Sequence, residues 1–132
     1  GCAVIGTQLL KFLPSPSHPA SNALMENQSL TLVLSMLFVA AIVAPIWEEI
    51  MFRGLLFPAL SGRTQRIALS AVVTSLLFAM IHPQGIPLWI ALGVVGGASC
   101  TLVHFTKSLV PSVVMHGMHN LTLLAITIAL FN

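Results

Sequence analysis

The amino-acid sequence predicts an all-α protein, a polytopic membrane helical bundle with about four core transmembrane helices. Three observations support this fold class. Hydrophobic residues make up 57% of the 132 residues and charged residues only 6%, whereas about a quarter of the residues in a soluble domain are charged. The hydrophobic residues form several long runs. The longest runs approach the roughly 20 residues that a helix needs to cross a bilayer.

The first 29 residues are predicted to be the end of a preceding apolar segment followed by a polar loop. Gly1–Leu13 is apolar, and the proline-rich segment Pro14–Pro19 cannot continue a helix, because proline lacks a backbone donor. The chain begins with Gly1 instead of Met, which indicates a piece of a longer protein. We expect the core domain to occupy residues 30–132.

Four spans are expected in this core. They are Leu30–Gly62, Ile67–His82, Leu88–His104 and a last span that begins near Pro111. The run Leu30–Trp47 contains no ionisable residue. Pro45 lies inside the first span, so we expect the helix to kink or restart there. Pro83 closes the second span.

The loops after the first and third spans carry the cations Arg63, Arg66 and Lys107. In an up-and-down bundle these loops share one face, which the positive-inside rule makes cytoplasmic. We therefore expect a multi-pass integral protein, in contact with membrane lipid and located in the cell membrane.

Charge and cysteine content argue against a nucleic-acid-binding protein and against a disulfide-rich or cysteine-ligated metal protein. The net charge is only +2, with scattered cations, so the basic surface needed to bind nucleic acid is absent. Cys2 and Cys100 have no CxxC spacing, which predicts packing residues and not a disulfide framework or thiolate metal site.

Glycines in the third span predict close helix packing. Gly93, Gly96 and Gly97 lack side chains that would hold a neighbouring helix away. A substrate groove beside these glycines is the alternative interpretation.

Two adjacent glutamates lie in the first span, where ionisable groups are costly and usually functional. Glu49 and Arg53 are spaced i, i+4, so they share a helix face and can neutralise each other. Glu48 points about 100° away from Glu49 and has no local partner. Glu48 is therefore the candidate reactive carboxylate.

Polar residues in the second and fourth spans are the other candidates. His82 ends the second span, and His116 and Asn120 share a face of the fourth span at i, i+4. His119 adjoins them. Taken singly, each is more often a capping residue or a hydrogen-bonding link between helices.

The depth of these residues in the membrane favours a common site. Counted from the basic loops at 1.5 Å per residue, Glu48 lies ~21 Å deep, His82 ~24 Å and Asn120 ~20 Å. His116 lies about 6 Å lower than Asn120. A carboxylate, two imidazoles and an amide at one depth suit the activation of water for amide hydrolysis. Glu48 is the expected general base.

At these positions the sequence resembles the CAAX-protease and bacteriocin-processing membrane proteases, also called the Abi family. Its three motifs are matched in order, by Glu48-Glu49-x-x-x-Arg53, Phe78-x-x-x-His82 and His116-x-x-x-Asn120. The resemblance covers roughly Leu30 to Asn132. It implies an intramembrane peptidase in which Glu48, His82, His116 and Asn120 are catalytic. Glu49 and Arg53 would then be supporting residues, and Phe78 would shape the site.

The resemblance leaves the cofactor and substrate open. A zinc ion, if one is used, would have Glu48, His82 and His116 as ligands, although the His-Glu-x-x-His motif is absent. We favour a glutamate mechanism with no obligatory metal. A CAAX-type tail or a leader peptide would each fit as the peptide substrate. The alternatives are a non-catalytic membrane module, such as a bacteriocin-immunity or scaffolding protein, and a proton-coupled transporter.

Overall fold

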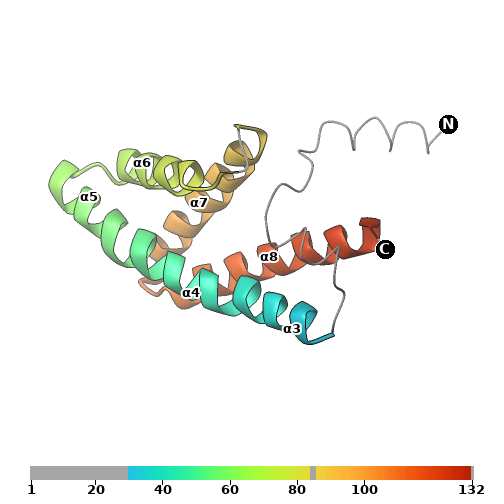
Figure 1. The fold of residues 1–132 in the computed structure, drawn as a ribbon. Coiled ribbons are helices and arrows are strands. Elements are labelled where there is room, and N and C mark those ends of the chain that lie inside the picture. The colour runs from blue at the N-terminus through green and yellow to red at the C-terminus, as the bar shows by residue number, and fades with distance from the viewer. Residues whose placement is uncertain (1–29, 84–85, 132) are drawn as a thin grey trace.

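The computed structural model describes residues 30–83 and 86–131, which form helices joined by short turns and contain no strand. The predicted segment 1–29, with Cys2, lies outside the described residues. The elements are α3 (Leu30–Phe38), η1 (Val39–Val43), α4 (Ala44–Glu49), η2 (Ile50–Leu56), α5 (Phe57–Thr64), α6 (Ile67–Met80), α7 (Ile86–Thr106) and α8 (Val110–Phe131). The first five elements run end to end as one long rod, Leu30–Thr64 (Figure 1).

The rod and the three later helices form a bundle. Helix α7 packs against both α6 and α8, while α8 also lies beside η1 and α4 of the long rod (Figure 1). Helix α6 returns along α5. The predicted all-α bundle is confirmed, and the four predicted spans correspond to the long rod, α6, α7 and α8.

Two prolines are accommodated in the long rod without ending it. Pro45 and Pro58 each lie in the first turn of an α-helix, and each is preceded by a π-helical turn, η1 or η2. In these turns a backbone N–H reaches the carbonyl five residues back, as Ala44 does to Val39. The wider turn makes room for the ring and redistributes the hydrogen bonds that proline cannot make. The helix therefore continues through Pro45, with a π-helical turn at the place where a kink or restart was expected.

The polarity of the bundle is opposite to that of a soluble protein. Large apolar side chains such as Trp47, Ile90 and Val94 are 65–69% exposed, whereas fully buried positions include Glu49 and Arg53. Serines and threonines fill other buried positions: Ser70, Thr74, Ser75, Ser99 and Ser112. Apolar exterior and polar interior are expected when lipid, not water, surrounds the helices.

By length and composition, two of the described helical segments can cross a membrane. They are Thr31–Thr64, with 34 residues, and Leu88–Thr106, with 19. The apolar segments Ile67–Met80 and Val110–Ile126 are shorter. The described part of the bundle therefore has two candidate membrane spans and two shorter apolar helices.

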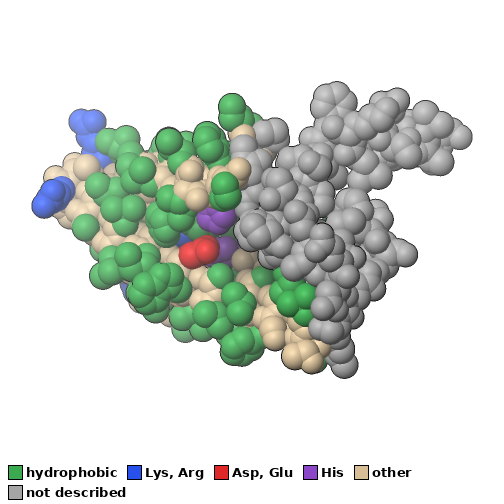
Figure 2. Space-filling view, viewed as in Figure 1, with side chains coloured by type: hydrophobic (Ala, Val, Ile, Leu, Met, Phe, Trp, Pro, Cys, Tyr) green, Lys and Arg blue, Asp and Glu red, His purple; other side chains and the backbone are tan. Residues whose placement is uncertain are grey.

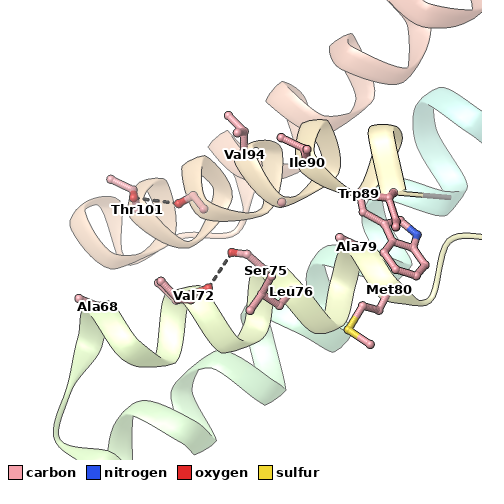
Figure 3. Close-up of a pocket in the computed structure, with 14 residues that line it drawn as sticks. Ala68, Val72, Ser75, Leu76, Ala79, Met80, Trp89, Ile90, Val94 and Thr101 are labelled. Carbon is pink, nitrogen blue, oxygen red and sulfur yellow. Dashed lines mark hydrogen bonds between the residues drawn. The ribbon is translucent and has the colours of Figure 1, made fainter. Parts of the chain in front are cut away.

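The glycines of α7 differ in how closely a neighbouring helix approaches them. A Cβ on Gly96 would lie 2.9 Å from Ser75 Cβ, so α6 and α7 touch there as predicted. A Cβ on Gly93 would meet nothing within 4 Å. Gly93 and Gly97 instead line an apolar groove of about 740 Å³ between α6 and α7. Figure 3 shows Ile90 and Val94 of α7 on one side of this groove and Leu76 of α6 on the other, and none of the candidate catalytic residues lines it.

Candidate active site

The predicted ion pair in the long rod is present and fully buried. Arg53 Nη1 donates to Glu49 Oε1 at 3.0 Å, and both side chains have zero exposed area. Glu49 ends α4 and Arg53 lies in η2, one turn further along the rod. The guanidinium also lies 4.5 Å from the centre of the Phe78 ring. A buried cation is thus matched by one carboxylate and two aromatic rings, those of Phe78 and, at 5.9 Å, Phe52.

Glu49 has further partners that the sequence did not predict. His116 Nδ1 lies 3.0 Å from Glu49 Oε1, and Ser99 Oγ donates to the same oxygen at 3.3 Å. Since a carboxylate only accepts hydrogen bonds, Nδ1 of His116 carries the proton in this contact. Glu49 therefore joins the long rod to α7 and α8, and it sets the orientation of the His116 ring.

Glu48 lies on the other side of the same imidazole. Its Oε2 is 3.5 Å from His116 Nε2, which is longer than a good hydrogen bond, and its side chain is 23% exposed. Oε2 is buried and has no hydrogen-bond partner among the described residues. The prediction that Glu48 lacks a cation of its own on the long rod agrees with this arrangement, although His116 is a neighbour from α8.

His82 is oriented by two backbone contacts at the end of α6. Its Nδ1 lies 2.8 Å from the carbonyl oxygen of Phe78, which can only accept, so Nδ1 carries the proton. The lone pair of the neutral ring is then on Nε2. The indole N–H of Trp89 donates to the carbonyl of His82 at 2.7 Å and ties the end of α6 to α7.

Phe78 is completely buried at the centre of the site. Its ring packs edge-on against His82 and His116, with centroids 4.9 and 5.5 Å apart, and against Phe52 at 5.3 Å. A rigid aromatic ring thus separates and aligns the two imidazoles. Phe78 is therefore in direct contact with both candidate histidines.

Asn120 of α8 contacts the long rod. Its Nδ2 donates to the carbonyl oxygen of Ala40, in η1, at 3.0 Å. An amide NH₂ group has two hydrogens, so one N–H remains after this contact.

The four candidate catalytic residues line one cavity of about 520 Å³. Apolar residues from α3, α7 and α8 complete its wall, among them Met36, Leu88, Leu92 and Leu123. In Figure 2 an acidic side chain and histidines are visible together within a surface of mainly hydrophobic side chains. The predicted spatial convergence of acid, imidazoles and amide is therefore present.

The sequence did not predict some residues that contact the site, and two other residues that it singled out do not line the cavity. Ser99 and Trp89 have no distinctive sequence spacing, and only the packing of α7 reveals their contacts. His119 does not line the cavity. Cys100 is a buried free thiol, as expected for a packing residue.

The residues fit a metal ion poorly. Within residues 30–83 and 86–131, no group of three or more histidine, cysteine, aspartate or glutamate side chains is arranged to hold one. Glu48, His82 and His116 thus do not form a three-ligand set in this geometry.

Comparison with known proteins gives one family and one relative. The family described as "type II CAAX prenyl endopeptidase Rce1-like" matches residues 30–122, which is more than half of the chain and includes every candidate site residue. An Escherichia coli protein named as an uncharacterized 24.3 kDa protein is 35% identical over 82 residues. That match covers 61% of this chain and 38% of the relative, so the chain spans well under two thirds of that protein. No solved structure matches the chain significantly.

Proposed function

Because the chain belongs to the Rce1-like family of membrane-embedded proteases, we propose that it is an intramembrane endopeptidase in which Glu48 activates water. The observation that carries this proposal is the cavity lined by Glu48, His82, His116 and Asn120, from three separate helical segments. Ionisable and polar side chains are costly to place inside a membrane and are usually functional there. Four of them at one cavity therefore favour a catalytic site.

The first step is attack by water on the scissile carbonyl. Glu48 Oε2 has no partner among the described residues and accepts the proton of a water molecule in the cavity as general base. The hydroxyl oxygen bonds to the carbonyl carbon and forms a tetrahedral intermediate. The carbon–nitrogen bond then breaks, and Glu48 returns the proton to the leaving amine.

His82 is suited to hold the attacking water. The Phe78 carbonyl fixes its proton on Nδ1, so Nε2 offers a lone pair to the second hydrogen of the water. Two acceptors, Glu48 and His82, then orient the oxygen lone pair of the water toward the substrate.

His116 and Asn120 are suited to stabilise the oxyanion. Asn120 has one N–H left after its contact with Ala40. His116 donates from Nε2 when it carries a second proton, and its charge with that of Arg53 then balances the carboxylates of Glu48 and Glu49. The free-energy cost of burying these four ionised groups in a low-dielectric site is lowest when their charges sum to zero.

The substrate is a membrane-associated peptide. The cavity offers mostly aliphatic wall beside its polar groups, which suits a peptide that enters from or near the bilayer. A CAAX-type tail and a leader peptide both have this character, and prenylation of the substrate is a separate question for experiment. The protein acts, in this proposal, as a multi-pass protein of the cell membrane.

Cleavage of fluorogenic peptides by the purified protein in detergent tests the proposal. Farnesylated and unmodified CAAX peptides and a leader-like peptide are compared, each with and without a chelator. Glu48→Gln should abolish turnover while the protein still folds, because the amide cannot accept the proton. Thr101→Ala, on the exposed face of α7, should keep the native rate.

Undiminished cleavage by a folded Glu48→Gln protein would refute Glu48 as the base. Loss of activity with chelator and its return with zinc would replace the glutamate mechanism by a metal-dependent one. No cleavage of any peptide by the native protein would favour a non-catalytic membrane module.

A further inference from the structure

The carbonyl group that Asn120 contacts has lost both its α-helical and its π-helical donor. In a regular α-helix the carbonyl of Ala40 accepts from the N–H of Ala44. Here the N–H of Ala44 bonds to Val39 instead, because η1 is a π-helical turn. The donor five residues after Ala40 would be residue 45, which is proline and has no N–H. The Ala40 carbonyl is thus left for a partner outside the long rod.

Helix α8 supplies that partner and packs closely against the same turn. Asn120 Nδ2 donates to Ala40 O at 3.0 Å. One turn earlier, a Cβ on Gly117 would clash with the carbonyl oxygen of Ala41. The carbonyl of Ala41 is the one that residue 45 would bond in an α-helix. Pro45 itself is completely buried.

We propose that Pro45 is a positioning residue for Asn120: it keeps the Ala40 carbonyl free so that one N–H of the Asn120 amide is anchored there. This inference rests on the proposed function, since Asn120 acts there as an oxyanion donor. An anchored amide has a fixed plane, so its second N–H has a fixed direction at the cavity that Asn120 lines. Without the anchor the amide rotates, and the donor is aligned for only part of the time.

Pro45→Ala tests this directly, because either outcome gives the Ala40 carbonyl a competing donor. If the π-helical turn persists, the new N–H of residue 45 competes for it, and if the turn becomes α-helical, the N–H of Ala44 does. In the peptide-cleavage assay we expect kcat to fall about tenfold with KM changed less than about twofold, since only alignment in the transition state is lost. Asn120→Ala should lower kcat about a hundredfold, as loss of an oxyanion donor does. The double variant should be no slower than Asn120→Ala by more than about twofold.

Pro58→Ala is the matched control. Pro58 also follows a π-helical turn, but it is exposed and lies 13 residues further along the rod, ~20 Å from Pro45. It should keep kcat within about twofold of the native value. A native kcat in folded Pro45→Ala, or independent effects of Pro45→Ala and Asn120→Ala that multiply in the double variant, would overturn the proposal.

An NMR measurement separates this inference from the proposed activity. In protein labelled with ¹⁵N-asparagine, the two side-chain protons of Asn120 should be well separated in shift, with one exchanging slowly with solvent. Asn120→Ala identifies the signals, and Pro45→Ala should bring them together. Equivalent, rapidly exchanging protons in the native protein would overturn the inference even if the variant fails to fold. Absence of peptidase activity would instead remove the proposed function and leave this comparison intact.

Discussion

At the scale of single residues, two adjacent glutamates differ because of what surrounds each one. Glu49 has no exposed area and accepts from Arg53, Ser99 and His116. Glu48 is 23% exposed and lines the cavity. Oε2 of each carboxylate is buried without a hydrogen-bond partner among the described residues. The difference is that three donors hold Glu49 at its Oε1, whereas Glu48 faces the cavity, which Glu49 does not line. Environments that differ in this way assign two chemically identical side chains to different roles.

The first prediction at this scale concerns the buried ion pair. Arg53→Ala should lower the free energy of unfolding by about 3–5 kcal/mol, because it leaves the carboxylate of Glu49 buried without its cation. Glu49→Gln should lower it similarly and also release His116. Thermal unfolding in detergent and the yield of monodisperse protein measure both effects.

The exposed cation at Arg63 provides the control for this prediction. Arg63→Ala should change the unfolding free energy by no more than about 0.5 kcal/mol, since its side chain is at the surface. Normal yield and stability together with lost peptidase activity in Arg53→Ala would assign Arg53 to catalysis instead.

The sequence predicted part of this site because helix geometry alone determines some neighbours. The pairing of Glu49 with Arg53 follows from their i, i+4 spacing, and the common depth of Glu48, His82 and Asn120 follows from the rise per residue. The contacts of Ser99, Trp89 and the Ala40 carbonyl depend on how helices rotate against one another. Nothing in a single sequence specifies that rotation.

At the scale of elements, the long rod owes its local shape to its prolines. The sequence predicted a kink or a restart at Pro45, and the structure has a π-helical turn directly before that proline, after which the helix continues. The π-helical turn provides alternative hydrogen bonds at the place where proline cannot donate one. The limits of the helices were predicted to within a few residues, since charges and prolines mark the ends of apolar runs.

A second prediction, at this scale, concerns the contact between α6 and α7. Gly96→Ala should lower the free energy of unfolding by about 1–3 kcal/mol, because the new Cβ would lie 2.9 Å from Ser75 Cβ and 3.1 Å from Arg53 Nη2. Gly93→Ala is the matched control, as its Cβ meets nothing within 4 Å. Gly93→Ala should be neutral, or stabilising by up to about 1 kcal/mol through helix propensity.

Thermal unfolding of the two variants under identical detergent conditions measures the difference. Equal stability of Gly96→Ala and Gly93→Ala would show that α6 and α7 are not in close contact at Gly96. A lower peptidase rate in Gly96→Ala alone is also expected, since the displaced Arg53 holds Glu49.

At the scale of the whole molecule, the reversed polarity connects fold and function. Serine, threonine and charged side chains share the interior with a few apolar ones such as Phe78 and Leu92, and many large apolar side chains are exposed on the described surface. The buried polar groups link helices where lipid provides no hydrogen bonds, so the same interior that holds the bundle together also holds the candidate site. The outer groove between α6 and α7 belongs to the apolar exterior and is separate from that interior.

This polarity leads to the last prediction, which compares two exposed positions of α7. Val94 lies in the middle of the span Leu88–Thr106 and is 69% exposed, while Phe105 lies at its end and is 77% exposed. If lipid surrounds α7, Val94→Lys places a charge in the hydrocarbon at a cost of about 2.5–3.5 kcal/mol. Phe105→Lys places the same charge ~16 Å further along the helix, where the side chain reaches the interface. The fraction of protein that stays in the membrane after alkaline extraction should therefore fall for Val94→Lys and remain native for Phe105→Lys. In a water-exposed helix both lysines would be tolerated equally, and that result would contradict a lipid-facing α7.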